Sequence, residues 1–178
     1  MGSYKVEGII IKRKNFGETD RILTVFTKKE GKIKILAKGV RKINSRRAPH
    51  VELLNLSILN LHEGKMLILT EAETRSHYSS LKNDLKKAGF AFYVCELVDG
   101  LVPEHQENRA VYNLLEQTLY DLEIIRDPRP LIKRFEQEIL ILLGFWSRER
   151  MFLEEGDRFI EDLMEKKIKT KRIFPDLS

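Results

Sequence analysis

Residues 20–38 read D-R-I-L-T-V-F-T-K-K-E-G-K-I-K-I-L-A-K, two apolar runs separated by a turn signal. The first run, 20–27, is rich in β-branched residues, and the second, 33–38, partly alternates apolar and charged positions. The segment K-E-G-K (29–32) supplies the glycine that a tight turn favours. The stretch therefore predicts a β-hairpin.

Strand signals continue on both sides of this hairpin. Y-K-V-E-G-I-I-I-K-R-K (4–14) precedes it through the turn N-F-G-E (15–18), and residues 51–61 and 66–74 follow it, joined through E-G-K (63–65). Between them, 39–50 is polar, basic and loop-like. Five short strands within about 75 residues favour a small barrel of the OB type. An SH3-like barrel is the rival interpretation.

The apolar period becomes helical from Ser79 onward. Pro103 ends the first run, and Gly144 ends a later one. Helices are predicted over about 80–102, 107–124, 130–143 and 157–168. The predicted fold class is α+β, with a five-stranded OB-fold barrel over 1–76 followed by an all-α helical domain over 77–178.

Composition excludes several classes of protein. About 42% of the 178 residues are hydrophobic, yet no run approaches the length of a transmembrane helix. The N-terminal M-G-S-Y-K-V lacks the apolar segment of a secretory signal. The single cysteine, Cys95, excludes an internal disulfide framework and multi-cysteine zinc sites. We therefore expect a cytoplasmic protein.

Charge is unevenly distributed along the chain. Residues 1–50 carry a balance of +10, whereas residues 51–178 carry −5. Such an asymmetry indicates that the N-terminal part meets a polyanion. Nucleic acid is the first candidate, and an anionic membrane surface is the second.

Signals of catalysis are lacking. The sequence contains no nucleophile elbow, zincin, Walker A or dinucleotide-binding motif. The four histidines have no metal-ligand spacing, and Cys95 falls on the apolar face of a predicted helix, where a structural thiol is expected. We predict a protein that is not an enzyme and uses no metal or other cofactor.

Aromatic residues near the basic strands are few. Phe26 lies in the middle of a predicted strand and is expected in the core. Phe16 stands beside Gly17 at a turn and is the better candidate for stacking on a base. Backbone electrostatics should then dominate binding, with weak sequence preference and steep salt dependence.

Several segments resemble the RecO family of bacterial recombination mediators. They are Y-K-V-E-G-I-I-I-K (4–12), G-E-T-D-R-I-L-T-V-F-T (17–27), E-G-K-I (30–33), A-K-G-V-R-K (37–42), S-R-R (45–47) and L-T-E-A-E (69–73). In the helical part, residues 81–103 and R-F-E-Q-E-I-L-I-L-L-G-F (134–145) are similar to the family's helices. The resemblance covers most of the chain.

The resemblance implies a non-enzymatic DNA-binding mediator of homologous recombination and DNA repair. Such proteins bind single- and double-stranded DNA and anneal complementary strands. With RecR, they load RecA onto DNA coated by single-strand-binding protein. Their helical domain contacts the acidic, apolar C-terminal tail of single-strand-binding protein. A bacterial, cytoplasmic, nucleoid-associated protein is implied, with no membrane partner.

Matching positions in the basic part acquire expected roles from this resemblance. Asp20 is expected to have a structural role at its turn, and Gly31 and Gly39 are expected to serve backbone geometry. Contacts with the DNA backbone are expected from Arg13, Arg21, Lys38, Arg41, Lys42, Arg46 and Arg47.

Two segments could receive the tail of single-strand-binding protein. One is Lys133 and Arg134 near Leu131 and Phe135. The other is Arg148 and Arg150 beside Phe145 and Trp146. We expect Trp146 to lie in the core between the two domains in preference to lining a pocket for the tail.

The sequence departs from the family pattern after residue 146. Many members insert a four-cysteine zinc element there, and this chain continues with charged residues instead. We therefore expect a shortened form without zinc. The alternative functions are an RNA-binding or ribosome-associated OB module, an adaptor that acts through its helical domain, and an enzyme with an unrecognised site.

Overall fold

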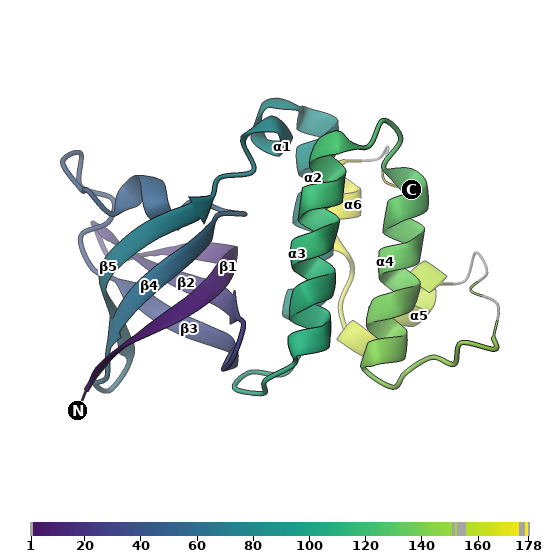
Figure 1. Ribbon diagram of the computed structural model, residues 1–178, viewed down its shortest axis with the longest axis horizontal. Helices are drawn as coiled ribbons and strands as arrows, with labels where there is room; N and C mark the ends of the chain where they lie inside the picture. Colours follow the sequence, from purple (N-terminus) through teal and green to yellow (C-terminus); the bar gives the residue numbers. More distant parts are fainter. Residues whose placement is uncertain (1, 151, 153–155, 175–176, 178) are drawn as a thin grey trace. The chain divides into compact units, whose positions relative to one another are not determined.

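The computed structural model describes residues 2–150, 152, 156–174 and 177. Five strands form a closed barrel in the order β1-β2-β3-β5-β4. The strands are β1 (Ser3–Phe16), β2 (Asp20–Thr27), β3 (Gly31–Ala37), β4 (Leu56–His62) and β5 (Leu67–Ser76) (Figure 1). All neighbouring pairs are antiparallel except β3 and β5, which close the barrel in parallel. The OB-type α+β prediction is confirmed.

Alternation along the strands fills the barrel. The buried cluster inside it is aliphatic. Its members include Val6, Ile10, Leu23, Val25, Ile33, Ile35, Leu59, Leu61 and Leu69. Phe26 is fully buried, as predicted. Burial of these side chains is the dominant stabilising contribution to the barrel.

The prediction of a strand from Val51 was wrong by five residues. A 3-10 helix, η1 (Ala48–Val51), occupies the start of that run, and β4 begins only at Leu56. Leu54 adopts a positive φ of 73°, and its N–H donates to the carbonyl oxygen of Ile10, beside a bulge in β1. Val51 and Leu54 are buried although they lie in this irregular segment. Their apolar side chains therefore reflect burial in the core and not membership of a strand.

Smaller differences concern the ends of strands. β1 continues through Phe16, and the turn is formed by residues 17–19. Lys38, predicted to lie in the third strand, follows the last residue of β3.

After β5, the described residues form mainly helices. Its helices are α1 (Ser79–Asn83), α2 (Leu85–Leu101), α3 (Arg109–Ile124), α4 (Arg129–Leu142), α5 (Gly156–Met164) and α6 (Lys169–Ile173). The single helix predicted over 80–102 is divided at Asp84, which has an extended backbone. The Asp84 carboxylate accepts a hydrogen bond from the Lys87 N–H at 3.1 Å and caps α2. The last predicted helix range, 157–168, extends beyond the end of α5 at Met164, and α6 lies outside that range.

The chain divides into two compact units. The barrel unit comprises Met1–His77 and Pro103–Arg109, and the helical unit comprises Tyr78–Val102 and Ala110–Ser178. The predicted domains 1–76 and 77–178 assigned residues 103–109 to the helical part, and that division stays a prediction. In the described part of the chain, no helix combines the length and the apolar character that a bilayer-spanning helix needs.

Segment 103–109 is held on β3. The His105 N–H donates to the carbonyl oxygen of Lys32 at 3.0 Å, and Glu104 forms an isolated parallel bridge with Lys32. The Glu104 carboxylate also pairs with the Lys34 ammonium at 2.6 Å. Backbone and side-chain contacts therefore join this segment to the barrel.

Candidate nucleic-acid interface

Two turns meet at one end of the barrel through Asp20. Its carboxylate accepts hydrogen bonds from the Gly39 N–H at 2.7 Å and from the Thr19 hydroxyl at 3.1 Å. The Arg41 N–H donates to the Thr19 carbonyl oxygen at 2.8 Å. The Gly39 hydrogen bond is the main cause that lowers the pKa of Asp20. This carboxylate thus joins the β1–β2 turn to the loop that follows β3, in agreement with the structural role expected of it.

Two arginines share one carboxylate at the same end. Arg13 forms an ion pair with Glu52, and an Arg21 guanidinium nitrogen lies 3.7 Å from the other Glu52 oxygen. Burial, then the positive charges of Arg13 and Arg41, lower the pKa of Arg21, and Glu52 opposes them. One acid therefore only partly compensates this group of cations.

Three further cations surround these turns and point to solvent. Lys38, Arg41 and Lys42 are exposed, and both lysines act electrostatically on Asp20. Arg41 donates one long hydrogen bond, 3.4 Å, to the Gly17 carbonyl oxygen. We call this set the basic end: Arg13, Arg21, Lys38, Arg41 and Lys42. Its five cations exceed the three acids of these turns and the adjoining segment, Glu18, Asp20 and Glu52. The protein already engages the carboxylates of Asp20 and Glu52.

Arg47 is used differently from its neighbours. Its guanidinium donates to the carbonyl oxygens of Leu69 and Lys38, both at 2.7 Å. These hydrogen bonds fasten the loop to β5. Arg46 is exposed and lines a cleft of about 520 Å³ with Arg47 and His50. The structure therefore brings five of the seven expected DNA-contact cations into the basic end and places Arg46 and Arg47 on the adjoining loop.

Phe16 lies close to this region. It is the last residue of β1 and pairs with Asp20 across the hairpin. Half of its surface, 50%, is exposed. An exposed ring beside cations can stack on a base while the cations contact phosphates.

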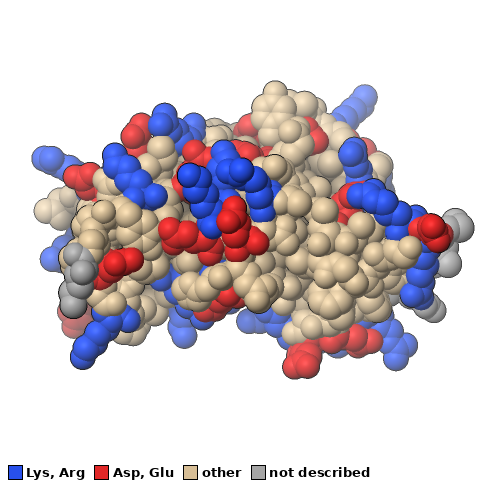
Figure 2. Space-filling view, turned by 60° about the horizontal axis from the view of Figure 1, so that its bottom comes forward, with Lys and Arg blue, Asp and Glu red and all other residues tan. Residues whose placement is uncertain are grey.

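Basic and acidic side chains are mixed on the face that Figure 2 shows. Much of the positive charge in that view has acidic neighbours. Lysines and arginines that already form ion pairs within the protein are less available to a ligand. The cations without such a pair therefore indicate a ligand site better than the total number of lysines and arginines.

The two segments expected to receive a protein tail differ in their surroundings. Arg134 and Leu131 line a cleft of about 510 Å³ with Asp121, Ile124, Ile125 and Pro130. Lys133 is not among its lining residues and pairs with the buried Glu136 at 3.4 Å.

The second segment is largely satisfied internally. Arg148 pairs with Glu138 at 3.2 Å. Arg150 stacks over Trp146, 4.1 Å from the ring centre. Trp146 was expected between the two domains, yet it packs edge-on against Phe152 and Phe159 of the helical unit. An incoming tail would have to displace these contacts.

Metal and thiol chemistry find little support in the described residues. No group of three or more histidine, cysteine, aspartate or glutamate side chains is arranged there to hold a metal ion. Cys95 is buried, and burial raises the pKa of its thiol to about 12. The thiol is therefore protonated at neutral pH and inert as a nucleophile.

Sequence reasoning missed Glu52 and Glu104. Glu52 lies in a run interpreted as a strand, and Glu104 lies between two predicted helices. Their ion pairs with Arg13 and Lys34 join residues 39 and 70 positions apart. No local pattern in the sequence signals such pairs.

A closed OB barrel with a basic end, followed by a helical unit, defines an OB-fold protein of the α+β class. Residues 1–78 match the family model "Recombination protein O N terminal", and residues 82–146 match "Recombination protein O C terminal". The chain belongs to the RecO family.

Curated relatives agree with this assignment. A protein named DNA repair protein RecO from Symbiobacterium thermophilum is 38% identical over 147 residues, which cover 82% of this chain and 58% of the relative. Proteins of the same name from Moorella thermoacetica and Roseiflexus are each 36% identical, covering 83% and 80% of this chain and 55% and 50% of theirs. The chain thus spans about half the length of the curated relatives it matches.

Proposed function

We propose that this chain acts in DNA repair and homologous recombination as a non-enzymatic DNA-binding mediator. The observation that carries the proposal is the basic end, in a chain that belongs to the RecO family. Asp20 and Glu52 are occupied within the protein, so part of the positive charge there lacks a counterion among the residues that the structure describes. Backbone phosphates of single- or double-stranded DNA supply that counterion, and Phe16 offers a stacking surface.

Annealing of complementary strands follows from this kind of binding. Two strands repel each other through their phosphates. A surface that neutralises phosphates leaves the base edges free to pair, because contacts to the backbone carry no sequence information. The reaction needs no covalent step and no nucleotide hydrolysis.

Partners are proposed on the same basis. The chain would act with RecR and so assist RecA loading on DNA coated by single-strand-binding protein. The tail of that protein combines acidic residues with a terminal apolar residue, and its receptor needs an apolar cleft with a cationic rim. The cleft of Leu131 and Arg134 has both features, and its arginine is not held in an ion pair within the described chain.

The first experiment is a fluorescence anisotropy titration of a labelled, unstructured oligonucleotide at several salt concentrations. Five contacting cations predict a slope of about −3.5 in a plot of log K against log salt for a single strand. The triple variant Lys38→Gln, Arg41→Gln, Lys42→Gln should lower the magnitude of the slope by about 2. A triple variant of exposed cations elsewhere, Lys65→Gln, Arg126→Gln, Lys166→Gln, is the matched control.

The outcomes separate the alternatives. Equal losses in the two triple variants would mean that net charge and not the basic end binds DNA. Tighter binding of RNA than of DNA of equal length would support the RNA-binding alternative. Absence of binding at low salt would leave the adaptor interpretation.

The proposed tail receptor has its own test. A peptide that ends in several acidic residues and one apolar residue should bind the full chain, and Arg134→Glu should weaken it at least tenfold. Arg148→Glu is the control, and a larger effect there would transfer the receptor to the Trp146 region.

A further inference from the structure

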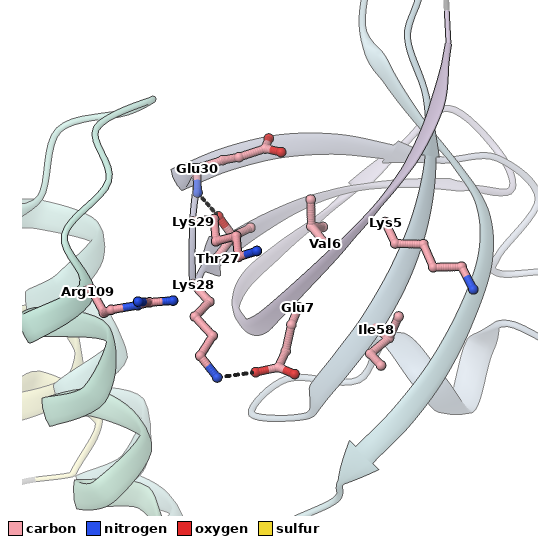
Figure 3. A pocket seen from close by; sticks show the side chains of 9 residues that line it. All are labelled: Lys5, Val6, Glu7, Thr27, Lys28, Lys29, Glu30, Ile58 and Arg109. Carbon is pink, nitrogen blue, oxygen red and sulfur yellow. Dashed lines mark hydrogen bonds and ion pairs between the residues drawn. The ribbon is translucent and has the colours of Figure 1, made fainter.

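A second cationic cleft lies on the barrel unit, over the first half of β1 and the turn between β2 and β3. Its volume is about 440 Å³. Figure 3 shows the lining side chains, Lys5, Val6, Glu7, Thr27, Lys28, Lys29, Glu30, Ile58 and Arg109. A cleft of this size is in the range of small-ligand sites.

Its acids are engaged within the protein. Glu7 pairs with Lys28 at 3.1 Å, and Glu30 accepts a hydrogen bond from the Tyr4 hydroxyl at 3.3 Å. Burial and the charge of Glu30 raise the pKa of Tyr4 to about 12, so this hydroxyl stays protonated and remains a donor.

Three of its cations have no partner among the residues that the structure describes. Lys5, Lys29 and Arg109 are exposed, and within the described residues no hydrogen bond or ion pair engages their side chains. They line one concavity whose four cations exceed its two acids. Figure 3 shows Lys28 and Arg109 on one side of the cleft and the Lys5 ammonium at its opposite edge. A surplus of positive charge along a concave site favours an anionic ligand, because a cleft focuses the field of its charges.

This cleft is distant from the basic end along the same strands. Lys5 precedes Arg13 by eight residues in β1, and Lys28 follows Arg21 by seven residues at the end of β2. At about 3.3 Å per residue, the two sites are roughly 25 Å apart. The separation from Arg13 and Arg21 exceeds the screening length of about 10 Å at moderate salt. The cleft of Arg46 and Arg47 is nearer, since Lys5 and Ile58 line both clefts.

We propose that this cleft binds the backbone phosphates of a second nucleic-acid strand while the basic end holds the first. The inference rests on the proposed function and extends it to a second site. Val6 and Ile58 give the cleft an apolar wall against which sugars can pack. Aromatic rings are lacking among the lining residues, so this site binds strands without regard to base identity.

Two separate sites on one barrel give annealing a mechanism. Tethering the second strand beside the first turns their encounter into an event at millimolar effective concentration. Each strand keeps its base edges free, since both sites contact the backbone.

The test uses the full chain and two non-complementary oligonucleotides, one labelled with a donor dye and one with an acceptor dye. The wild-type protein should give energy transfer between them. The cleft variant Lys5→Gln, Lys29→Gln, Arg109→Gln should lose this transfer and slow annealing of complementary strands at least tenfold. It should bind a single oligonucleotide within about threefold of wild type, because the basic end is intact. The triple variant of Lys65, Arg126 and Lys166 is again the control.

Each other outcome overturns the proposal in a recognisable way. Energy transfer retained in the cleft variant would show that the second strand binds elsewhere. An equal loss of single-strand binding would make the cleft part of the first site. A hexaglutamate peptide is the probe for an acidic protein partner. If wild type binds it more tightly than the oligonucleotides and the cleft variant does not bind it, the cleft is a site for an acidic protein. Failure of wild type to bind any oligonucleotide would instead refute the proposed function itself.

Discussion

At position 31, both the backbone conformation and the close approach of a neighbouring segment favour glycine over any residue with a side chain. Its φ is +69°, and a Cβ atom there would lie 2.0 Å from the carbonyl oxygen of Gln106. Gly17 has a similar φ of +56°, yet a Cβ atom there would meet nothing within 4 Å. A comparison of the two glycines therefore separates the energetic cost of a positive φ from the cost of a steric clash with Gln106.

We expect Gly31→Ala to lower the free energy of unfolding well beyond Gly17→Ala. The positive φ alone costs about 1–2 kcal/mol in either variant. The backbone clash with Gln106 should add about 1–3 kcal/mol at residue 31, the typical cost of overpacking. Urea unfolding followed by circular dichroism measures both. Equal losses of unfolding free energy in the two variants would show that segment 103–109 moves away from the added methyl group at no energetic cost.

The lowered pKa of Asp20 makes stability depend on pH. A carboxylate whose folded pKa is below its unfolded value, near 3.9, stabilises the fold above that pH and loses this contribution as pH falls. Wild type should therefore lose more stability than Asp20→Asn between about pH 5 and pH 2. Urea midpoints measured across this range test the point, with the exposed neighbour Glu18→Gln as control. Parallel curves for wild type and Asp20→Asn would contradict it.

Among the elements, α6 depends on a side chain 73 residues away. The Glu96 carboxylate accepts the N–H groups of Lys169 and Thr170, both at 2.8 Å, and also the Thr170 hydroxyl. A helix of five residues is marginal alone, and these are first-turn N–H groups that have no partner within the helix.

Glu96→Ala should release α6. We expect faster hydrogen exchange over 169–173 and a loss of about 1–3 kcal/mol, as for charged hydrogen bonds that leave a partner unsatisfied. Glu107→Ala, at an exposed position, is the control. Unchanged exchange in α6 would show that packing alone holds it.

For the whole molecule, the division into units assigns 103–109 to the barrel although helices flank it in sequence. The His105 amide should then open with β3 and not with α3. Hydrogen exchange at increasing denaturant should give His105 the same denaturant dependence as Ile33, whereas Leu115 reports the helical unit. A match of His105 to Leu115 would contradict this assignment.

Local patterns predicted most elements. β2 was predicted at its observed bounds, and the barrel class followed from the number and spacing of strands. The prediction failed where apolar residues were buried without regular pairing, as at Val51 and Leu54, and where a short element depends on a remote cap, as in α6. The spacing of apolar residues indicates which positions are buried. It does not indicate with which segment the backbone of those residues forms hydrogen bonds.

The candidate site was only partly readable from the sequence. Charge asymmetry pointed to the first 50 residues as the part that meets a polyanion, and the family resemblance supplied the individual cations expected there. It did not show that Arg47 donates to the carbonyl oxygens of Leu69 and Lys38.

Composition and short-range periodicity, by themselves, determined the strands, most of the helices and a basic N-terminal part, because these depend on neighbouring residues. Only the tertiary structure decided which cations are neutralised and which stay unpaired. Glu52 meets Arg13 and Arg21 because the barrel closes, and Lys5, Lys29 and Arg109 line one cleft because segment 103–109 packs on β3. The strength of a charge interaction depends on distance in space, and chain closure sets that distance between residues far apart in sequence.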